Sequence, residues 1–200
     1  MPTTALGYLQ KLSELMLGIE VTERGGAPLS LEEGAEKAVQ RLLSVGSSHS
    51  KVMLVGNGGS AAIVSHVQND ICKAVGIRAL VFTEQPLLTA LANDNGYGSV
   101  YEFPVEQWAE AGDLLWAVSS SGKSENILRA AQAASDRGCS IMTLTGFSPD
   151  NPLRQTGGLN FYVASDVYGY VETAHAGLSH MITDRTRITI QAASKANATV

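Results

Sequence analysis

Two segments of this chain repeat one plan, in which an apolar run is followed by a glycine- and serine-rich turn and then by a helical stretch. The first joins residues 51–55 to the turn 56–60, and the second joins residues 113–118 to the turn 119–124. Each apolar run is typical of a buried strand. Glycine lets the backbone approach a ligand closely, and the following helix directs free N–H groups at the turn. The plan predicts two turns that bind phosphate or sugar hydroxyls.

Strand and helix patterns alternate through the rest of the chain. Strands are predicted at 52–55, 79–82, 114–118, 140–145 and 159–163, and helical stretches at about 60–74, 86–110, 124–136 and 171–192. Such alternation predicts an α/β fold, a doubly wound, flavodoxin-like, five-stranded parallel sheet.

Two further helices are predicted before this alternation begins. They cover residues 6–19 and a stretch from Ser30, which forms a capping box with Glu33, to about Leu43. We therefore expect a single domain, with residues 1–46 as a helical appendage for oligomerisation and residues 47–195 as the core.

Familiar phosphate-binding motifs do not account for both turns. A Walker A motif fails because Ala117 occupies the place of its first glycine. Residues 56–61 fit the loose dinucleotide pattern, with Glu84 as a candidate ribose-binding acid, but that pattern leaves the second turn unexplained. Glycine and serine also occur in turns for purely conformational reasons. Two such turns, one with a cluster of four serines, favour a phosphorylated small molecule.

Composition narrows the class of protein. The net charge of −5 argues against nonspecific nucleic-acid binding, and the 16% charged content, low for a monomer of 200 residues, predicts a homo-oligomer. No apolar run approaches the roughly 18 residues of a membrane span, and the N-terminus lacks the pattern of a signal peptide. Cys72 and Cys139 are too few for a disulfide framework. We expect a cytoplasmic protein with no membrane partner.

The motifs in and around the two turns resemble those of the sugar isomerase (SIS) domain family, and within it the phosphoheptose isomerase branch. The resemblance spans roughly residues 5 to 190. The matching segments are 56–62, His66, 92–94, 96–97, 119–124, Asn126, 143–146, 171–172, His175 and His180.

The resemblance implies a role for each matching position. Catalysis would fall to Asp70 and His180, and a divalent metal, usually zinc, would be held by His66, Asp70, Glu172 and His180. Substrate binding would fall to Asn57, Gly58, Gly59, Ser60, Asp94, Ser119, Ser120, Ser121, Ser124 and Glu172, with the serine turn holding the phosphate. The family pattern also implies a homotetramer with active sites at subunit interfaces.

Four positions depart from the family pattern. Asp70 replaces the usual glutamate, Glu172 replaces glutamine, Gly169 replaces an acid and Ile63 replaces a common aspartate. These departures indicate a divergent subgroup, whose substrate can be a heptose, hexose or pentose phosphate.

The spacing of the reactive residues gives separate information on which of them can act together. His66 and Asp70 lie four residues apart and face the same side of a helix. Spacing alone pairs Glu172 with His175, whereas the family pairs it with His180, which leaves His175 as a possible packed histidine. Two neutral histidines and two carboxylates match the charge and ligand preference of Zn²⁺.

The sequence therefore predicts a metal-assisted aldose–ketose isomerase. The reaction that the resemblance implies converts sedoheptulose 7-phosphate to D-glycero-D-manno-heptose 7-phosphate through a cis-enediol. One alternative is a nonenzymatic SIS module that binds a protein partner or senses a sugar phosphate. The other is an isomerase of a different ketose phosphate.

Overall fold

The computed structural model describes residues 4–197. In chain order, its helices and strands are α1 (Ala5–Leu17), β1 (Glu20–Glu23), β2 (Pro28–Leu29), α2 (Leu31–Ser47), β3 (Val52–Gly56), α3 (Gly59–Asp70), η1 (Ile71–Val75), β4 (Ala79–Val81), α4 (Gln85–Asp94), α5 (Ser99–Trp108), β5 (Leu114–Ser119), α6 (Glu125–Asp136), β6 (Ser140–Thr145), α7 (Pro152–Thr156), β7 (Leu159–Tyr162) and α8 (Tyr168–Asn197). Here η1 is a short π-helix that continues α3.

The central sheet has the strand order β2-β1-β7-β6-β5-β3-β4. The strands from β7 to β4 are parallel, which confirms the predicted five-stranded doubly wound sheet. The prediction missed the β1–β2 hairpin, which pairs antiparallel with β7 and extends the sheet to seven strands. It also missed the short helix α7.

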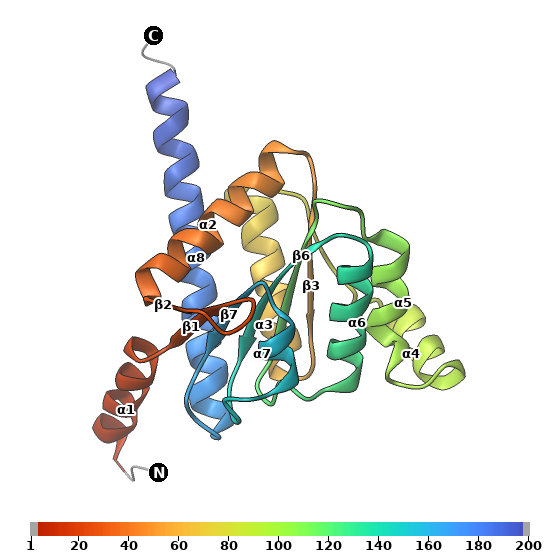
Figure 1. Ribbon diagram of the computed structural model, residues 1–200, viewed down its shortest axis with the longest axis horizontal. Helices are drawn as coiled ribbons and strands as arrows, with labels where there is room; N and C mark the ends of the chain where they lie inside the picture. Colours follow the sequence, from red (N-terminus) through yellow and green to blue (C-terminus); the bar gives the residue numbers. More distant parts are fainter. Residues whose placement is uncertain (1–3, 198–200) are drawn as a thin grey trace.

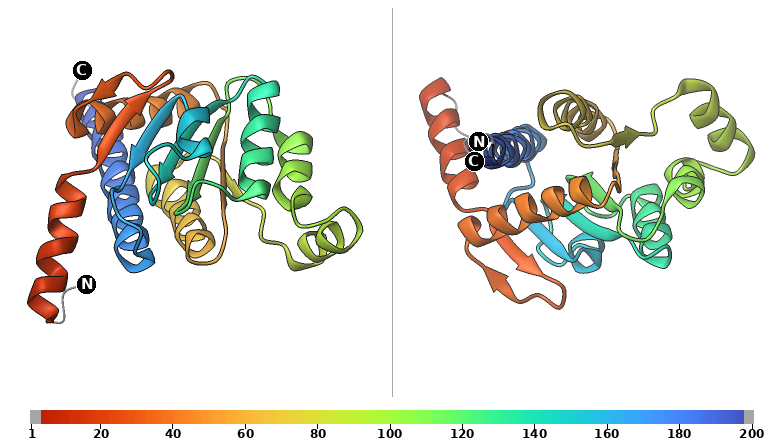
Figure 2. Two further views of the ribbon diagram at one scale, coloured as in Figure 1. Left: turned by 60° about the horizontal axis from the view of Figure 1, so that its bottom comes forward. Right: turned by 90° about the horizontal axis from the view of Figure 1, so that it is seen from above.

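Helices cover both faces of the sheet (Figures 1 and 2). One apolar cluster joins α1, α2, α3 and α8 to one face of the sheet, where strand residues such as Leu54 and Trp116 point. The other joins α4, α5, α6 and α7 to the opposite face, where the adjacent strand residues such as Met53 and Leu115 point. This alternation follows from the two-residue period of a strand, since successive side chains point to opposite faces. The strands buried on both faces hold the two glycine- and serine-rich turns in fixed positions at their carboxyl ends.

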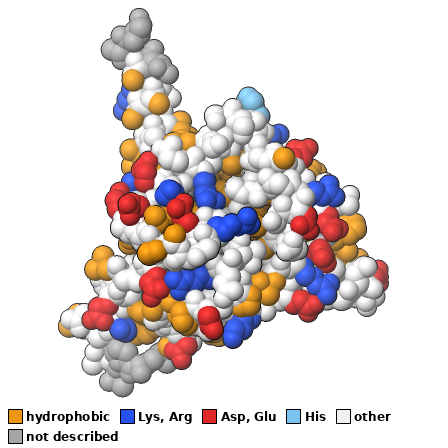
Figure 3. Space-filling view, in the orientation of Figure 1, with side chains coloured by type: hydrophobic (Ala, Val, Ile, Leu, Met, Phe, Trp, Pro, Cys, Tyr) orange, Lys and Arg blue, Asp and Glu red, His pale blue; other side chains and the backbone are white. Residues whose placement is uncertain are grey.

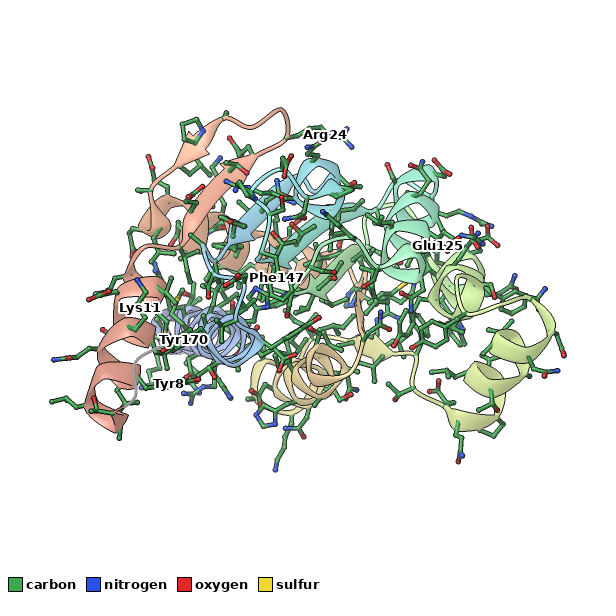
Figure 4. The ribbon with its side chains drawn as sticks, turned by 90° about the horizontal axis from the view of Figure 1, so that it is seen from below. Tyr8, Lys11, Arg24, Glu125, Phe147 and Tyr170 are labelled. Atoms are coloured by element: carbon green, nitrogen blue, oxygen red, sulfur yellow. The ribbon has the colours of Figure 1, made fainter. Side chains whose placement is uncertain are left out.

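The N-terminal helices pack on α8. Tyr8 of α1 stacks on Tyr170 with ring centroids 4.5 Å apart, and the two side chains lie together in Figure 4. Arg185 forms ion pairs with Glu32 and Glu36 of α2 at 2.8 and 3.2 Å. The capping box of Ser30 and Glu33 is present at the start of α2, as predicted.

The surface combines mixed charge with two projecting helices. Basic and acidic side chains are interspersed on the face in Figure 3, and α1 and the C-terminal part of α8 project from the body in Figure 1. Within residues 4–197, no helix combines the length and apolar character needed to cross a membrane.

Candidate active site

The two glycine- and serine-rich turns meet at the carboxyl edge of the parallel strands β3 and β5. Together with the start of α8 they enclose a cavity of about 260 Å³. Its lining consists of Asn57, Gly58, Gly59, Ser60, Ser119, Ser120, Ser121, Ser124, Tyr168 and Glu172. Nine of these ten residues are among the predicted substrate-binding positions, so the structure brings the two turns into one site.

The serine turn presents hydroxyls and a helix N-terminus to this cavity. Ser124 is the N-cap residue of α6, but its side chain makes no capping hydrogen bond. Ser120 is buried, and its Oγ has no hydrogen-bond partner among the described residues. Ser119 Oγ accepts a hydrogen bond from the backbone N–H of Gly122 at 3.2 Å, which fixes the turn. Uncommitted hydroxyls beside the positive end of a helix are suited to an anion such as phosphate.

The glycine turn differs because its helix already faces a carboxylate of the protein. Gly58 has φ +54°, and a Cβ added to Gly59 would lie 2.4 Å from Glu172 Oε2, so the Glu172 carboxylate lies directly over Gly59 at the start of α3. A negative charge at a helix N-terminus is stabilising. This carboxylate disfavours a second anion at the start of α3.

Asn57 is held by neighbouring side chains. Its amide exchanges two hydrogen bonds of 2.9 Å with the amide of Asn126, and Tyr97 donates to Asn57 Oδ1 at 3.2 Å. This pair of hydrogen bonds joins the first turn to α6, which follows the second turn, and so fixes the position of one turn relative to the other.

A second group of polar side chains lies where α3 packs against α8. Asp70 Oδ2 lies 3.5 Å from His66 Nε2 and 3.3 Å from His180 Nδ1, and the ligand atoms of the three residues all lie within 4.8 Å of one another. His66 and His180 also line a largely apolar cavity of about 230 Å³. The π-helix η1 begins directly after Asp70, and π-helical turns are frequent at functional sites.

This group suits a divalent metal by its donor atoms. Ligands at about 2.1 Å from a tetrahedral zinc ion are roughly 3.4 Å apart, which is close to the two distances from Asp70. Glu172 does not belong to the group and instead lies over Gly59, so its predicted role as a metal ligand has no geometric support in this structure.

His175 is a packed histidine, one of the two roles that its spacing allowed. It is fully buried, its Nε2 lies 3.1 Å from the Thr145 carbonyl oxygen, and burial lowers its pKa to about 4. It therefore remains neutral and does not belong to the group of His66, Asp70 and His180.

Two further residues differ from expectation. Asp94, predicted to bind substrate, lies at the end of α4 and does not line the cavity of this chain. Tyr168 lines the cavity although no motif indicated it. Its only sequence signal is its position one helical turn before Glu172.

Comparison with known proteins agrees with this geometry. Residues 19–146 match the SIS domain family. The chain belongs to the SIS domain family. Over 82% of its length it is 32% identical to a phosphoheptose isomerase from Pelobacter propionicus, of which 87% is covered. A phosphoheptose isomerase from Aliarcobacter butzleri is 31% identical over 76% of this chain and 84% of its own length.

Solved structures share the fold of this SIS domain protein. Phosphoheptose isomerase from Neisseria gonorrhoeae aligns with a TM-score of 0.73 at 25% identity, over 90% of this chain and 91% of that one. A phosphoheptose isomerase from Francisella tularensis aligns with a TM-score of 0.78 at 22% identity, over 92% and 99% of the two chains.

Proposed function

We propose that this chain is a phosphosugar isomerase that converts sedoheptulose 7-phosphate to D-glycero-D-manno-heptose 7-phosphate. The enzyme class follows from its family and from relatives that are phosphoheptose isomerases. The particular reaction is supported above all by one observation. Asp70 lies between two histidines, at 3.3 and 3.5 Å, on α3, the helix that begins at the serine cavity.

These residues provide the groups that an aldose–ketose isomerisation needs. A base removes a proton from C1 of the ketose, the resulting cis-enediol forms a new C–H bond at C2, and a proton moves from O1 to O2. We assign His180 as the base and Asp70 as its acid partner. No electron acceptor is required, because one carbon is oxidised as its neighbour is reduced.

We further propose an alternative role for His66, Asp70 and His180, in which they hold a divalent metal, most suitably zinc. A lone pair that binds the ion cannot also take up a proton, so in this alternative Asp70 and His180 are ligands rather than the acid–base pair. Two imidazoles and one carboxylate are a donor set that zinc accepts, and three protein ligands leave a position open. When bound, the ion would polarise the substrate oxygens and stabilise enediolate charge.

The separation of Glu172 and His180 along α8 supports a long substrate. Glu172 and His180 lie eight residues apart on α8, or roughly 12 Å along the helix axis. With C–C bonds of about 1.5 Å, an extended seven-carbon chain spans roughly 8 Å, and its phosphate adds a few ångströms. A seven-carbon sugar phosphate therefore comes close to this separation, whereas a triose phosphate is much shorter.

The first prediction concerns turnover in D₂O. Sedoheptulose 7-phosphate should yield an aldose labelled at C2, because an enediol exchanges its proton with solvent. Asp70→Asn and His180→Gln should each lower kcat at least 100-fold, since each removes an acid–base group. Asp184→Asn, on α8 and away from the cavity, is the matched control. A product without deuterium at C2 would contradict the enediol route. Full activity of both Asp70→Asn and His180→Gln would contradict their assignment as the acid–base pair.

The same assay with five-, six- and seven-carbon ketose phosphates decides the substrate. The heptulose should have the highest kcat/KM, because its carbon chain comes closest to the roughly 12 Å that separates Glu172 from His180 along α8. A higher value for a pentulose would instead favour the isomerase of another sugar phosphate. A protein that binds these ligands but turns over none of them would be a nonenzymatic sensor.

The second prediction concerns the metal. Untreated protein should contain about one divalent ion per chain, and chelation should remove both the ion and the activity. His66→Gln should lower the metal content, whereas His49→Gln, at an exposed loop position, should not. Full activity in metal-free protein would exclude the ion from the reaction.

A further inference from the structure

Tyr168 is an aromatic side chain at the mouth of the serine cavity to which the proposed reaction gives no role. It is the first residue of α8 and lines the cavity beside Glu172, with 59% of its surface exposed. A large exposed ring at a cavity mouth contributes nothing to the core. Its position therefore indicates contact with a ligand.

Phe147 holds this ring in place. The two rings meet edge to face, with centroids 4.9 Å apart and an interplanar angle of 74°. Phe147 itself packs against the apolar cluster of α8 and directly follows the loop residue Gly146 (Figure 4). Because Phe147 is anchored in the body of the protein, Tyr168 has a fixed support on one side.

The backbone of Phe147 is strained. Its φ of +59° lies in the left-handed region, which non-glycine residues rarely adopt. Two hydrogen bonds hold it there. Its N–H donates to the Ser165 carbonyl at 2.9 Å, and Tyr162 donates its hydroxyl to the Phe147 carbonyl at 2.8 Å. Such strain concentrates at ligand-binding sites, where the surrounding structure maintains it.

The position of Tyr168 on α8 determines which part of a ligand it meets. It precedes Glu172 by one turn, on the side away from His180, and so lies near the serine turn rather than near Asp70. The neighbouring Gly146 donates its N–H to the Ser120 carbonyl at 2.9 Å, which joins the Phe147 segment to that turn. The ring therefore faces the phosphate-bearing end of a bound chain.

We propose that Tyr168 is a specificity-determining residue whose ring packs against the carbon atoms next to the substrate phosphate. Phe147 is its positioning residue. The negative face of an aromatic ring attracts the slightly positive C–H groups of a sugar chain and excludes water from them. This inference rests on the proposed function. It adds that the ring of Tyr168 lets the site bind a sugar phosphate more tightly than inorganic phosphate.

The test measures binding rather than turnover, by titration calorimetry with sedoheptulose 7-phosphate and with inorganic phosphate. Tyr168→Ala should weaken binding of the sugar phosphate roughly tenfold and change binding of inorganic phosphate less than twofold, because only the former has carbons for the ring to contact. Tyr168→Phe keeps the ring and should bind both ligands as the unmodified protein does. Phe147→Leu should weaken binding of the sugar phosphate by roughly threefold and leave binding of inorganic phosphate unchanged.

Tyr170→Phe is the matched control, because Tyr170 lies two residues away and stacks on Tyr8 instead. It should leave both affinities unchanged. The proposal would be overturned if Tyr168→Ala and the unmodified protein bound the sugar phosphate with equal affinity. It would also be overturned if Tyr168→Ala lost affinity for the sugar phosphate and for inorganic phosphate by the same factor. If the unmodified protein binds no sugar phosphate at all, the proposed function fails instead.

Discussion

At the residue scale, His175 shows how complete burial affects a titratable group. Burial opposes the charged form and lowers its pKa from 6.5 to about 4, although the hydrogen bond with the Thr145 carbonyl acts in the opposite direction. The other ring nitrogen, Nδ1, has no partner among the described residues. The neutral ring is therefore part of the folded structure, whereas an unfolded chain protonates it near pH 6.5.

The third prediction follows from this difference. Between pH 6.5 and about 4 the unfolded state binds one more proton at this position, so the unfolding free energy should fall as the pH falls. The loss should approach roughly 3 kcal/mol across that interval. Urea unfolding at several pH values measures it. His175→Gln should reduce the pH dependence, whereas a variant with an unchanged slope would show that His175 titrates normally.

Residue spacing predicted some of the site and missed other parts for physical reasons. The four-residue interval between His66 and Asp70 placed them on one helical face, because the helix is regular there. The direction of Glu172 was not predictable, since it depends on the absence of a side chain at Gly59, which lies in a distant segment. Tyr168 was missed because a single aromatic residue outside a motif gives no periodic signal.

At the scale of elements, the serine turn is held in place by the segment that leads into α7. Gly122 has φ +63°, and a Cβ added there would lie in direct overlap with Asn151. Asn151 is buried, donates to the Ser148 carbonyl at 2.8 Å and accepts from the Arg154 N–H at 2.9 Å. Asn151 therefore has no room to move away from a larger residue.

The fourth prediction tests this contact. Gly122→Ala should destabilise the fold by roughly 2–4 kcal/mol, because it adds overpacking to the cost of a left-handed alanine, and should raise KM. Gly25→Ala is the matched control, since Gly25 has φ +84° but nothing within 4 Å of an added Cβ. It should cost only about 1–2 kcal/mol and leave KM unchanged. Thermal unfolding and steady-state kinetics of both variants separate the cost of overpacking from the cost of a left-handed alanine. If both variants lose the same stability and keep the same KM, Asn151 moves aside and the contact does not restrict the serine turn.

Element prediction from the sequence succeeded where strands are buried on both faces. The apolar runs of β3 and β5 are continuous and end at glycine- or serine-rich turns, so their limits were clear. The strand β1 has the sequence Glu-Val-Thr-Glu with one buried side chain, and β2 has two residues. Strands this short and polar show too little alternation of apolar and polar residues to be predicted from the sequence. The pairing of β1 with β7, and of β2 with β1, forms only in the assembled sheet.

At the scale of the whole molecule, α1 exposes an apolar surface. Leu6, Leu9 and Leu17 are 67%, 61% and 78% exposed on this projecting helix (Figure 2). Water contact with several leucines of one helix is unfavourable, and a second copy of the chain would cover them.

The fifth prediction is therefore a homotetramer, with sites at the subunit interfaces. Light scattering should give a mass about four times the 21.1 kDa of the chain. The double variant Leu6→Glu and Leu9→Glu should dissociate the assembly, because two charges cannot be buried without partners. Lys11→Glu, a change of charge on the same helix, is the control, since Lys11 is already exposed to solvent. A monomeric mass for the unmodified protein would contradict the prediction.

The ends of the central sheet limit how copies of this chain can meet. On one side the last strand is β2, two residues long and beginning with Pro28, and on the other it is β4, three residues long. Proline lacks the N–H that a neighbouring strand would need, and strands this short offer few backbone groups for pairing. Continuous sheets across molecules, the usual route to fibrous aggregation, are therefore disfavoured. Any association of this weakly charged chain is left to its helices.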